Sequence, residues 1–132
     1  MQPALRRLSA YMAEIYAATG RWSDAVAVLR PVAQRQALVR GLLGYSLVRS
    51  GARAEAMKLL TKMLADESAG QSRAFGIVEL YVGLGDYDRA FVWLDRSFDD
   101  YSLRAEIMGP LFDDFRADPR FDRVRLRLGL AH

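Results

Sequence analysis

Cysteine is absent from the 132 residues of the chain, and histidine occurs once, as His132 at the last position. The absence of cysteine excludes disulfides, thiol catalysis and thiolate metal sites. A single terminal histidine cannot supply a Ser-His-Asp triad or a metal site built on several imidazoles. Phosphate-binding glycine loops are lacking as well, because Gly83 and Gly85 have neither a third glycine at the required spacing nor a strand before them. We therefore expect a protein that is not an enzyme and that holds no cofactor or metal.

Long apolar runs are also missing. No stretch reaches the roughly 18 apolar residues that a membrane span needs, and residues 1–7 lack the charged-then-apolar order of a signal peptide. Hydrophobic residues make up 52% of the chain and charged residues 27%, a balance typical of a sequence that folds around a core. We expect one domain over residues 1–132, located in the cytoplasm and without a membrane partner.

Lysine is scarce, because arginine supplies 17 of the 19 basic residues. Residues 1–66 carry 10 basic and 4 acidic side chains, whereas residues 67–132 carry 9 and 12, so the two halves have net charges of +6 and −3. A basic half allows the hypothesis of an acidic partner such as nucleic acid. The arginines are nevertheless scattered at helical spacing without a row of aromatic residues, which is more typical of a solvated helix face. We therefore do not expect nucleic acid as the partner.

Three related stretches of sequence recur along the chain, at residues 20–25, 51–56 and 85–90. Each begins with glycine and ends with alanine, and the glycines are separated by 31 and 34 residues. The third stretch, Gly85-Asp86-Tyr87-Asp88-Arg89-Ala90, is the most complete. A period in this range is typical of proteins built from stacked helical units.

Apolar residues at steps of three and four flank each glycine, which predicts a pair of helices in every unit. We expect the glycine to end the first helix in the left-handed conformation. The alanine is expected where the two helices approach closely, because a larger side chain would force them apart. Ser23 or Asp24 is expected to cap the second helix, and Pro31 either kinks that helix or ends it near Arg30. The apolar faces predicted for the first and the sixth helix consist of Leu5, Leu8, Met12, Ile15 and Tyr16, and of Phe91, Leu94, Phe98 and Tyr101.

The C-terminal part departs from this pattern. Residues 109–115 read as a turn, and Asp118-Pro119 predicts the start of a last helix, with aspartate as its cap and proline at its first position. The aspartates in this part fit turns and helix starts better than a metal site. Because the end of a helical stack must cover an apolar face, we assign residues 103–132 a capping role. The apolar residues of the last helix are Phe121, Val124, Leu126 and Leu128, and Gly129 ends it.

The third unit resembles the tetratricopeptide repeat, a helical hairpin of about 34 residues. The resemblance is carried by Tyr81 in the first helix, residues 85–88 at the turn, Ala90 and Leu94. It implies an all-α fold, a right-handed superhelical stack of three helical hairpins at about residues 5–37, 38–70 and 71–102, with a C-terminal capping helix within residues 103–132. It also implies a non-enzymatic scaffold for protein–protein interaction, whose first helices line a concave groove for a peptide or a partner helix.

The resemblance also implies which residues line that groove. They are Arg7, Ala10, Glu14, Ala17, Leu38, Gly41, Tyr45, Arg49, Phe75, Glu79 and Val82. Among them, the candidate partner-binding residues are Arg7, Glu14, Tyr45, Arg49, Phe75, Glu79 and Val82. A protein or peptide is the expected partner, and self-association into a homodimer through an apolar edge of the stack is an alternative.

The tail carries a second resemblance. Residues 118–121 and 128–130 are similar to the end of tetratricopeptide regions in certain bacterial multidomain proteins, in which a winged-helix, cyclase or kinase domain stands on the N-terminal side. The preference for arginine over lysine agrees with a GC-rich bacterial source. This resemblance implies an alternative function, the C-terminal regulatory or sensor region of a bacterial transcriptional regulator or signalling enzyme.

Overall fold

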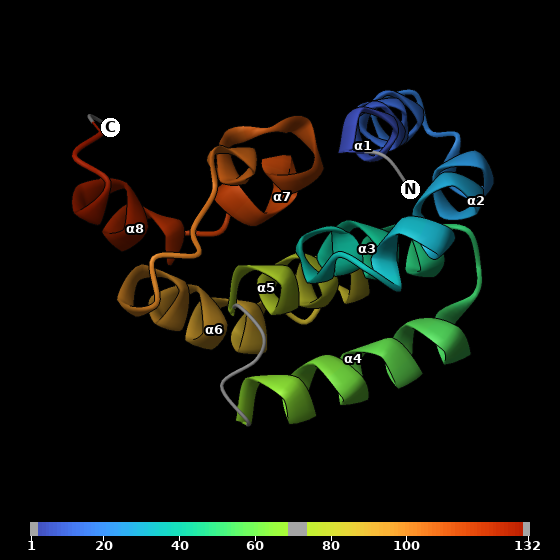
Figure 1. Ribbon diagram of the computed structural model, residues 1–132. Coiled ribbons are helices and arrows are strands. Elements are labelled where there is room, and N and C mark those ends of the chain that lie inside the picture. Colours follow the sequence, from blue (N-terminus) through green and yellow to red (C-terminus); the bar gives the residue numbers. More distant parts are fainter. Residues whose placement is uncertain (1–2, 69–73, 131–132) are drawn as a thin grey trace.

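The computed structural model describes the chain at residues 3–68 and 74–130, with side chains from Tyr11 to Glu67 and from Ala74 to Leu130. Every regular element in these two stretches is helical and none is a strand, which confirms the prediction of an all-α fold. Figure 1 shows α3, α5 and α6 in the middle of the molecule, with α4 on one side and α1, α7 and α8 on the other. The elements are α1 (Pro3–Ala18), α2 (Trp22–Ala33), η1 (Ala37–Val39), α3 (Arg40–Arg49), α4 (Arg53–Ser68), α5 (Ala74–Leu84), α6 (Tyr87–Asp99), η2 (Ala105–Met108), η3 (Pro110–Phe112), α7 (Asp113–Arg116) and α8 (Phe121–Arg127), where η denotes a 3-10 helix.

Consecutive helices pack in pairs, α1 with α2, α3 with α4 and α5 with α6. The glycine after the first helix of each pair has a positive φ, of 75° at Gly20, 93° at Gly51 and 76° at Gly85. The residue after each glycine donates its N–H to the carbonyl five positions earlier, at 2.7, 2.8 and 3.0 Å respectively. The three turns are therefore built in the same way, and the prediction that glycine ends the first helix is confirmed.

The alanine that follows each of these glycines lies in the first turn of the second helix. Ala25, Ala56 and Ala90 have no exposed surface, and each donates its N–H to the carbonyl of the residue after the glycine at 3.0–3.1 Å. Their complete burial agrees with the prediction that only a small side chain fits there.

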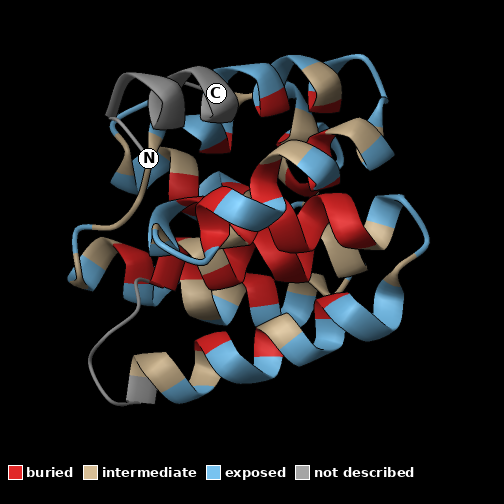
Figure 2. Cartoon of the chain, turned by 45° about the vertical axis from the view of Figure 1, so that its right-hand side comes forward, coloured by how far each residue is buried: buried red, intermediate tan, exposed pale blue. Residues whose placement is uncertain are grey.

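The central contact of the fold joins α3 to α5, and glycines permit it. A Cβ atom added to Gly41 would lie 2.5 Å from Glu79 Oε1 and 2.7 Å from the carbonyl oxygen of Gly76. One added to Gly44 would lie 2.4 Å from the side chain of Leu80. The backbone of α3 therefore lies directly against α5, and the buried residues gather in the middle of the molecule around this crossing (Figure 2).

The start of α2 differs from the expectation. Ser23 and Asp24 lie inside its first turn rather than at its cap, because the helix begins at Trp22. No side chain caps the helix, and Asp24 instead accepts a hydrogen bond from Arg21 Nε at 2.8 Å. Asp24 is thus held by a basic neighbour, and the prediction of a cap at either position is wrong.

The ends of α2 and α6 bear on two expectations. Of the two alternatives for Pro31, an end of the helix near Arg30 is not observed, since α2 continues to Ala33. A proline so close to the end of a helix interrupts few of its hydrogen bonds. Helix α6 ends at Asp99, so that Tyr101 lies outside it, with a φ of 57° and 93% of its surface exposed. Tyr101 is therefore not part of the apolar face predicted for this helix.

The apolar face predicted for α1 is not a core face. Met12 and Ile15 are 37% and 48% exposed, and Tyr11 beside them is exposed as well. The buried face consists instead of Ala13 and Ala17, small residues that let α1 approach α2. The side chains at positions 5 and 8 lie outside the described part of the structure. Periodicity thus identified the apolar residues on one side of α1, but Met12 and Ile15 on that side are not buried.

The C-terminal part contacts the helix pairs at two places. Residues 103–112, which we call the inner segment, contain η2 and η3 and lie over α3 and α5, while α8 packs on α6. The guanidinium of Arg127 on α8 lies 3.9 Å from the centre of the Phe98 ring and bonds to Asp95 at 3.1 Å. The region to which a capping role was assigned therefore lies partly over the inner helices and partly against α6.

The last helix begins later than predicted. Helix α8 starts at Phe121, and Asp118 precedes it in a turn where its carboxylate accepts a hydrogen bond from the N–H of Arg120 at 2.9 Å. Gly129 ends the helix as expected, with a φ of 75°. Leu126, one of the apolar residues predicted for this helix, is 65% exposed.

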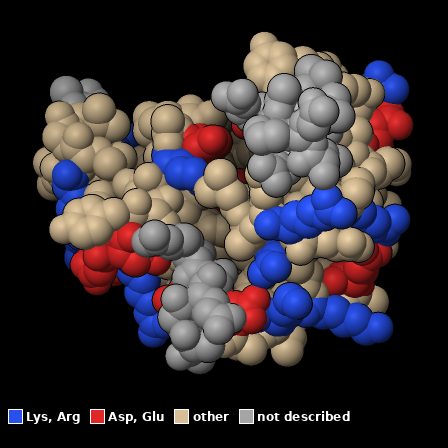
Figure 3. Space-filling model, in the orientation of Figure 1, with Lys and Arg blue, Asp and Glu red and all other residues tan. Residues whose placement is uncertain are grey.

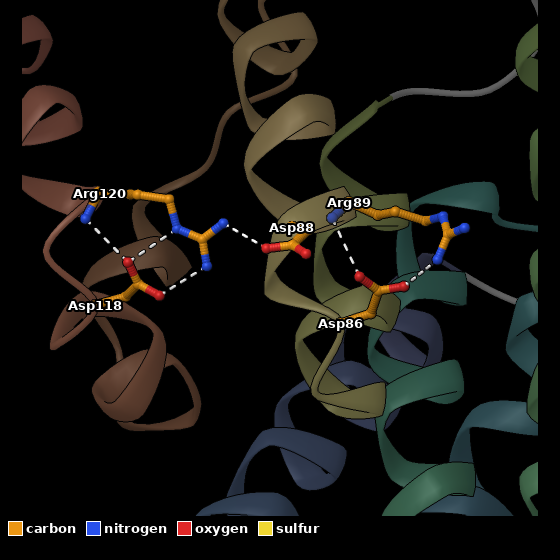
Figure 4. A network of polar contacts seen from close by, with 5 residues as sticks. All are labelled: Asp86, Asp88, Arg89, Asp118 and Arg120. Atoms are coloured by element: carbon orange, nitrogen blue, oxygen red, sulfur yellow. Dashed lines mark hydrogen bonds and ion pairs between the residues drawn. The ribbon is translucent and has the colours of Figure 1, made fainter.

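The most complete of the repeated turns holds the tail in place (Figure 4). Asp86 caps α6 by accepting a hydrogen bond from the N–H of Arg89 at 3.2 Å, and it also pairs with the Arg89 guanidinium at 2.6 Å. Two residues after Asp86, Asp88 forms an ion pair with Arg120 at 2.6 Å. Arg120 also forms an ion pair with Asp118 at 2.9 Å. The turn that marks the repeat in the sequence therefore also joins the tail to α6.

Candidate binding site

The residues that the resemblance placed on a groove come from three helices. Glu14 lies on α1, Tyr45 and Arg49 lie on α3, and Phe75, Glu79 and Val82 lie on α5, whereas the side chain of Arg7 is outside the described part. Tyr45, Phe75, Glu79 and Val82 are buried, and Glu14 and Arg49 are exposed. The structure brings Tyr45, Phe75 and Glu79 together beneath the inner segment.

Arg104 attaches the beginning of the inner segment to this face. Its guanidinium forms an ion pair with the buried carboxylate of Glu79 and donates a second hydrogen bond to the carbonyl oxygen of Leu38 at 3.1 Å. The same guanidinium lies 5.0 Å from the centre of the Phe75 ring. Glu79 and Phe75 therefore already bind a cationic side chain, which the chain itself supplies.

The end of the inner segment is attached as firmly. The hydroxyl of Tyr45 donates a hydrogen bond to the carbonyl oxygen of Leu111 at 3.2 Å. Phe112 is almost completely buried, with its ring centre 5.9 Å from that of Phe75. Residues 111–112 thus cover Tyr45 and Phe75. In an open groove, an extended ligand would occupy this same face.

Arg49 belongs to a separate cluster at the turn end of α3. Its guanidinium lies 5.8 Å from the ring centre of Trp22 and 5.6 Å from that of Tyr45, and these two rings are 5.5 Å apart. Trp22 comes from the first hairpin and Tyr45 from the second, so Trp22 packs between two hairpins. In this arrangement Arg49 covers aromatic rings at the surface.

A cleft of about 550 Å³ remains open between α1 and the inner segment. In Figure 3 the molecule is hollowed at this place, with acidic and basic atoms at the edge of the hollow. Its walls are mostly apolar, and the residues are Glu14, Ala17 and Ala18 of α1, Leu38, Val39 and Leu42 of η1 and α3, Glu79 of α5, and Arg104, Ala105, Glu106, Gly109, Pro110, Leu111 and Phe112 of the inner segment.

Among the described residues that line the cleft, acidic side chains outnumber basic ones. Three carboxyl groups line it, those of Glu14, Glu79 and Glu106, against the single guanidinium of Arg104. Burial raises the pKa of the Glu79 carboxyl to about 7, since the charge of Arg104 only partly opposes the loss of hydration and the charges of Glu106 and Glu14 raise it further. The cleft therefore has a negative potential when all three groups are ionised.

The cleft contains no chemistry of its own that suggests a reaction. Its polar side chains are three carboxylates and an arginine, without a hydroxyl or imidazole nucleophile. Across the described ranges there is no group of acidic or histidine side chains that could hold a metal ion, and no helix long and apolar enough to cross a membrane. Comparison of the chain with family models, curated proteins and solved structures finds no match.

Sequence reasoning missed the half of the cleft that comes from the inner segment. Arg104, Glu106 and Leu111 lie outside the repeats and were grouped with the cap. A usable signal was present, because Gly109-Pro110 prevents a continuous helix although apolar residues stand on both sides of it. An apolar segment that cannot form a helix must bury its side chains against elements that already exist, and here it does so on α3 and α5.

Proposed function

We propose that the chain is a non-enzymatic protein-interaction module that binds an extended segment of a partner protein in the cleft between α1 and the inner segment. In this proposal the helix pairs form a right-handed superhelical stack related to the tetratricopeptide repeat. The observation that supports it is the cleft itself, about 550 Å³ in volume, with apolar walls and a few charged groups. Sites of a few hundred to about 1,000 Å³ with this composition are typical of ligand binding.

The proposal differs from the open groove implied by the resemblance. Because residues 111–112 cover Tyr45 and Phe75, a partner would contact the part of the inner face nearer to α1. Leu38 lies in the wall of this cleft and is 61% exposed, so it offers an apolar contact that no described element of the chain covers fully. Exposed apolar side chains beside a cleft are common in interaction sites.

Selection of peptides from a random phage-displayed library tests this function with matched variants. Leu38→Ser removes an apolar contact from the cleft wall, whereas Leu126→Ser makes the same change on α8 at a leucine that is 65% exposed. We expect the unmodified chain and Leu126→Ser to select peptides with a shared motif, and Leu38→Ser to lose them, because the apolar contact of this side chain is removed without a change of charge. Retention of the same peptides by Leu38→Ser would show that the cleft is not the binding site.

A second candidate is the regulatory or sensor region of a bacterial transcriptional regulator or signalling enzyme. The outward face of α1 favours it, since Tyr11, Met12 and Ile15 are exposed together. Such an apolar face suits contact with a further domain or with a second copy of the chain. Replacement of Met12 and Ile15 by serine is expected to leave peptide binding in the cleft unchanged and to abolish any association through α1. Sedimentation of the two proteins at several concentrations measures this, and identical monomer behaviour of both would count against the candidate.

A further inference from the structure

We infer that the segment bound in the cleft carries an arginine or lysine among apolar residues, and that this basic side chain lies between Glu14 and Glu106. The inference rests on the proposed function, because it names the chemistry of the partner for the same cleft.

The ion pairs of the cleft leave two of its carboxylates without a basic partner. Arg104 pairs with Glu79, and among the described residues that line the cleft it is the only basic one. Within the described residues, no ion pair joins Glu14 or Glu106 to a basic side chain, although both are exposed at the cleft. A cationic group between them would have two carboxylates as partners, whereas an anionic group would be repelled by both.

The environment of Glu79 shows that Glu14 and Glu106 face the same space. The charges of both Glu106 and Glu14 contribute to the raised pKa of this carboxyl. The two exposed carboxylates therefore act on the same space as Glu79 rather than on separate surfaces. A cation that enters this space would interact favourably with Glu14 and Glu106, whereas Arg104 already balances the charge of Glu79.

The groups that bind Arg104 show which chemistry this part of the cleft accepts. Its guanidinium is bound by a carboxylate, by the carbonyl oxygen of Leu38 and by the face of Phe75. A guanidinium prefers this combination of planar acceptors and an aromatic ring. The walls beside it include Ala17, Leu42 and Pro110, which can cover the aliphatic stem of a basic side chain and its apolar neighbours. An anionic or entirely polar peptide would lack these contacts with the apolar walls.

The experiment uses two dye-labelled peptides that differ in one group. The first has arginine between two leucines, flanked by serine and glycine, and the second has the uncharged isostere citrulline in place of arginine. We expect fluorescence anisotropy to show binding of the arginine peptide about five- to tenfold tighter than binding of the citrulline peptide. The difference should shrink in about 1 M salt, because exposed charges are then screened.

Variants of the chain locate the effect. In Glu14→Gln combined with Glu106→Gln, the preference for arginine over citrulline is expected to fall to about twofold or less. Asp99→Asn removes one exposed carboxylate from α6 that does not line the cleft, and should keep the full preference. Circular dichroism confirms that the variants fold, which is expected because the substituted side chains are exposed.

The outcomes separate this inference from the proposed function. Equal binding of both peptides, or a preference that persists in the double variant, overturns the inference. If Leu38→Ser nevertheless weakens both peptides, the cleft remains a peptide-binding site and only its preference for a cation is refuted. Absence of binding by either peptide up to about millimolar concentration overturns the inference as well, while the phage selection with Leu38→Ser decides separately about the cleft.

Discussion

Replacement of Phe115 by alanine tests whether the C-terminal part belongs to the core. Phe115 on α7 has no exposed surface and lies among four other rings. Its ring centre is 4.3 Å from that of Phe91, 5.3 Å from Tyr87, 5.9 Å from Phe121 and 6.3 Å from Phe112. These partners belong to α6, to α8 and to the inner segment. Removal of one side chain therefore weakens three attachments at once.

The expected loss of stability follows from this environment. Substitution of a fully buried phenylalanine by alanine typically costs about 3–5 kcal/mol, and the aromatic pairs add to the contact area. We expect a loss near the upper end, a large part of the roughly 5–15 kcal/mol that stabilises an ordinary domain. Urea unfolding followed by far-ultraviolet circular dichroism measures it. The control is Leu126→Ala on α8, where the side chain is 65% exposed and a change within about 0.5 kcal/mol is expected.

Hydrogen exchange shows where the loss occurs. If the tail is part of the core, Phe115→Ala should increase amide exchange in α3 and α5 as well as in residues 103–130. If the tail were only a peripheral cap, amide exchange would become faster in residues 103–130 and would not change in α3. A free-energy loss below about 1 kcal/mol, or faster exchange restricted to the tail, would refute the reasoning.

Two further predictions concern the crossing of α3 and α5 and its carboxylate. Alanine normally stabilises a helix relative to glycine by about 1 kcal/mol, but Gly41→Ala should lower stability by about 1–3 kcal/mol because its Cβ would meet backbone at 2.7 Å. Thermal unfolding should show no such loss for Gly76→Ala, where the nearest atom to the Cβ would be the flexible end of Met63 at 3.1 Å and the backbone of Gly41 would lie in ordinary contact at 3.8 Å, and equal melting temperatures for the two variants would contradict the crossing. The pKa of Glu79 is about 7 in the fold against 4.5 as the ordinary value, so the folded chain keeps this proton at pH values where the unfolded chain has lost it. Stability should therefore decrease relative to Glu79→Gln by about 2–3 kcal/mol between about pH 5 and about pH 8, and a pH-independent difference in urea unfolding would refute the shift.

The turns could be predicted from the sequence because their cause is local. A glycine at Gly20, Gly51 and Gly85 allows the positive φ that a short turn after a helix requires. Because similar residues flank the three glycines, the sequence also indicates that the three turns form the same backbone hydrogen bonds. The start of α2 was less predictable, because Ser, Asp and Arg at neighbouring positions offer competing local partners and Asp24 pairs with Arg21.

Features that depend on distant residues could not be predicted in this way. The stripe through Met12 and Ile15 shows which face of α1 is apolar, but periodicity contains no information about what covers that face. The candidate site has the same difficulty. Tyr45, Phe75 and Glu79 lie close together in the structure, as helical spacing allows, whereas the segment that covers them lies far along the chain and has no helical periodicity of its own.

The inner segment has a consequence for how the chain folds. Tyr45 bonds to Leu111, and Arg104 to Leu38, each across 66 positions of sequence. In a simple row of hairpins every unit contacts only its neighbours, and folding can spread from any of them. Here two of the stabilising contacts form only after a long loop has closed, which slows folding and couples the first half of the chain to the last. The helix pairs are therefore expected to fold and unfold as one unit with the tail, and a chain shortened before Arg104 would expose the face of α3 and α5 instead of forming a smaller version of the same protein.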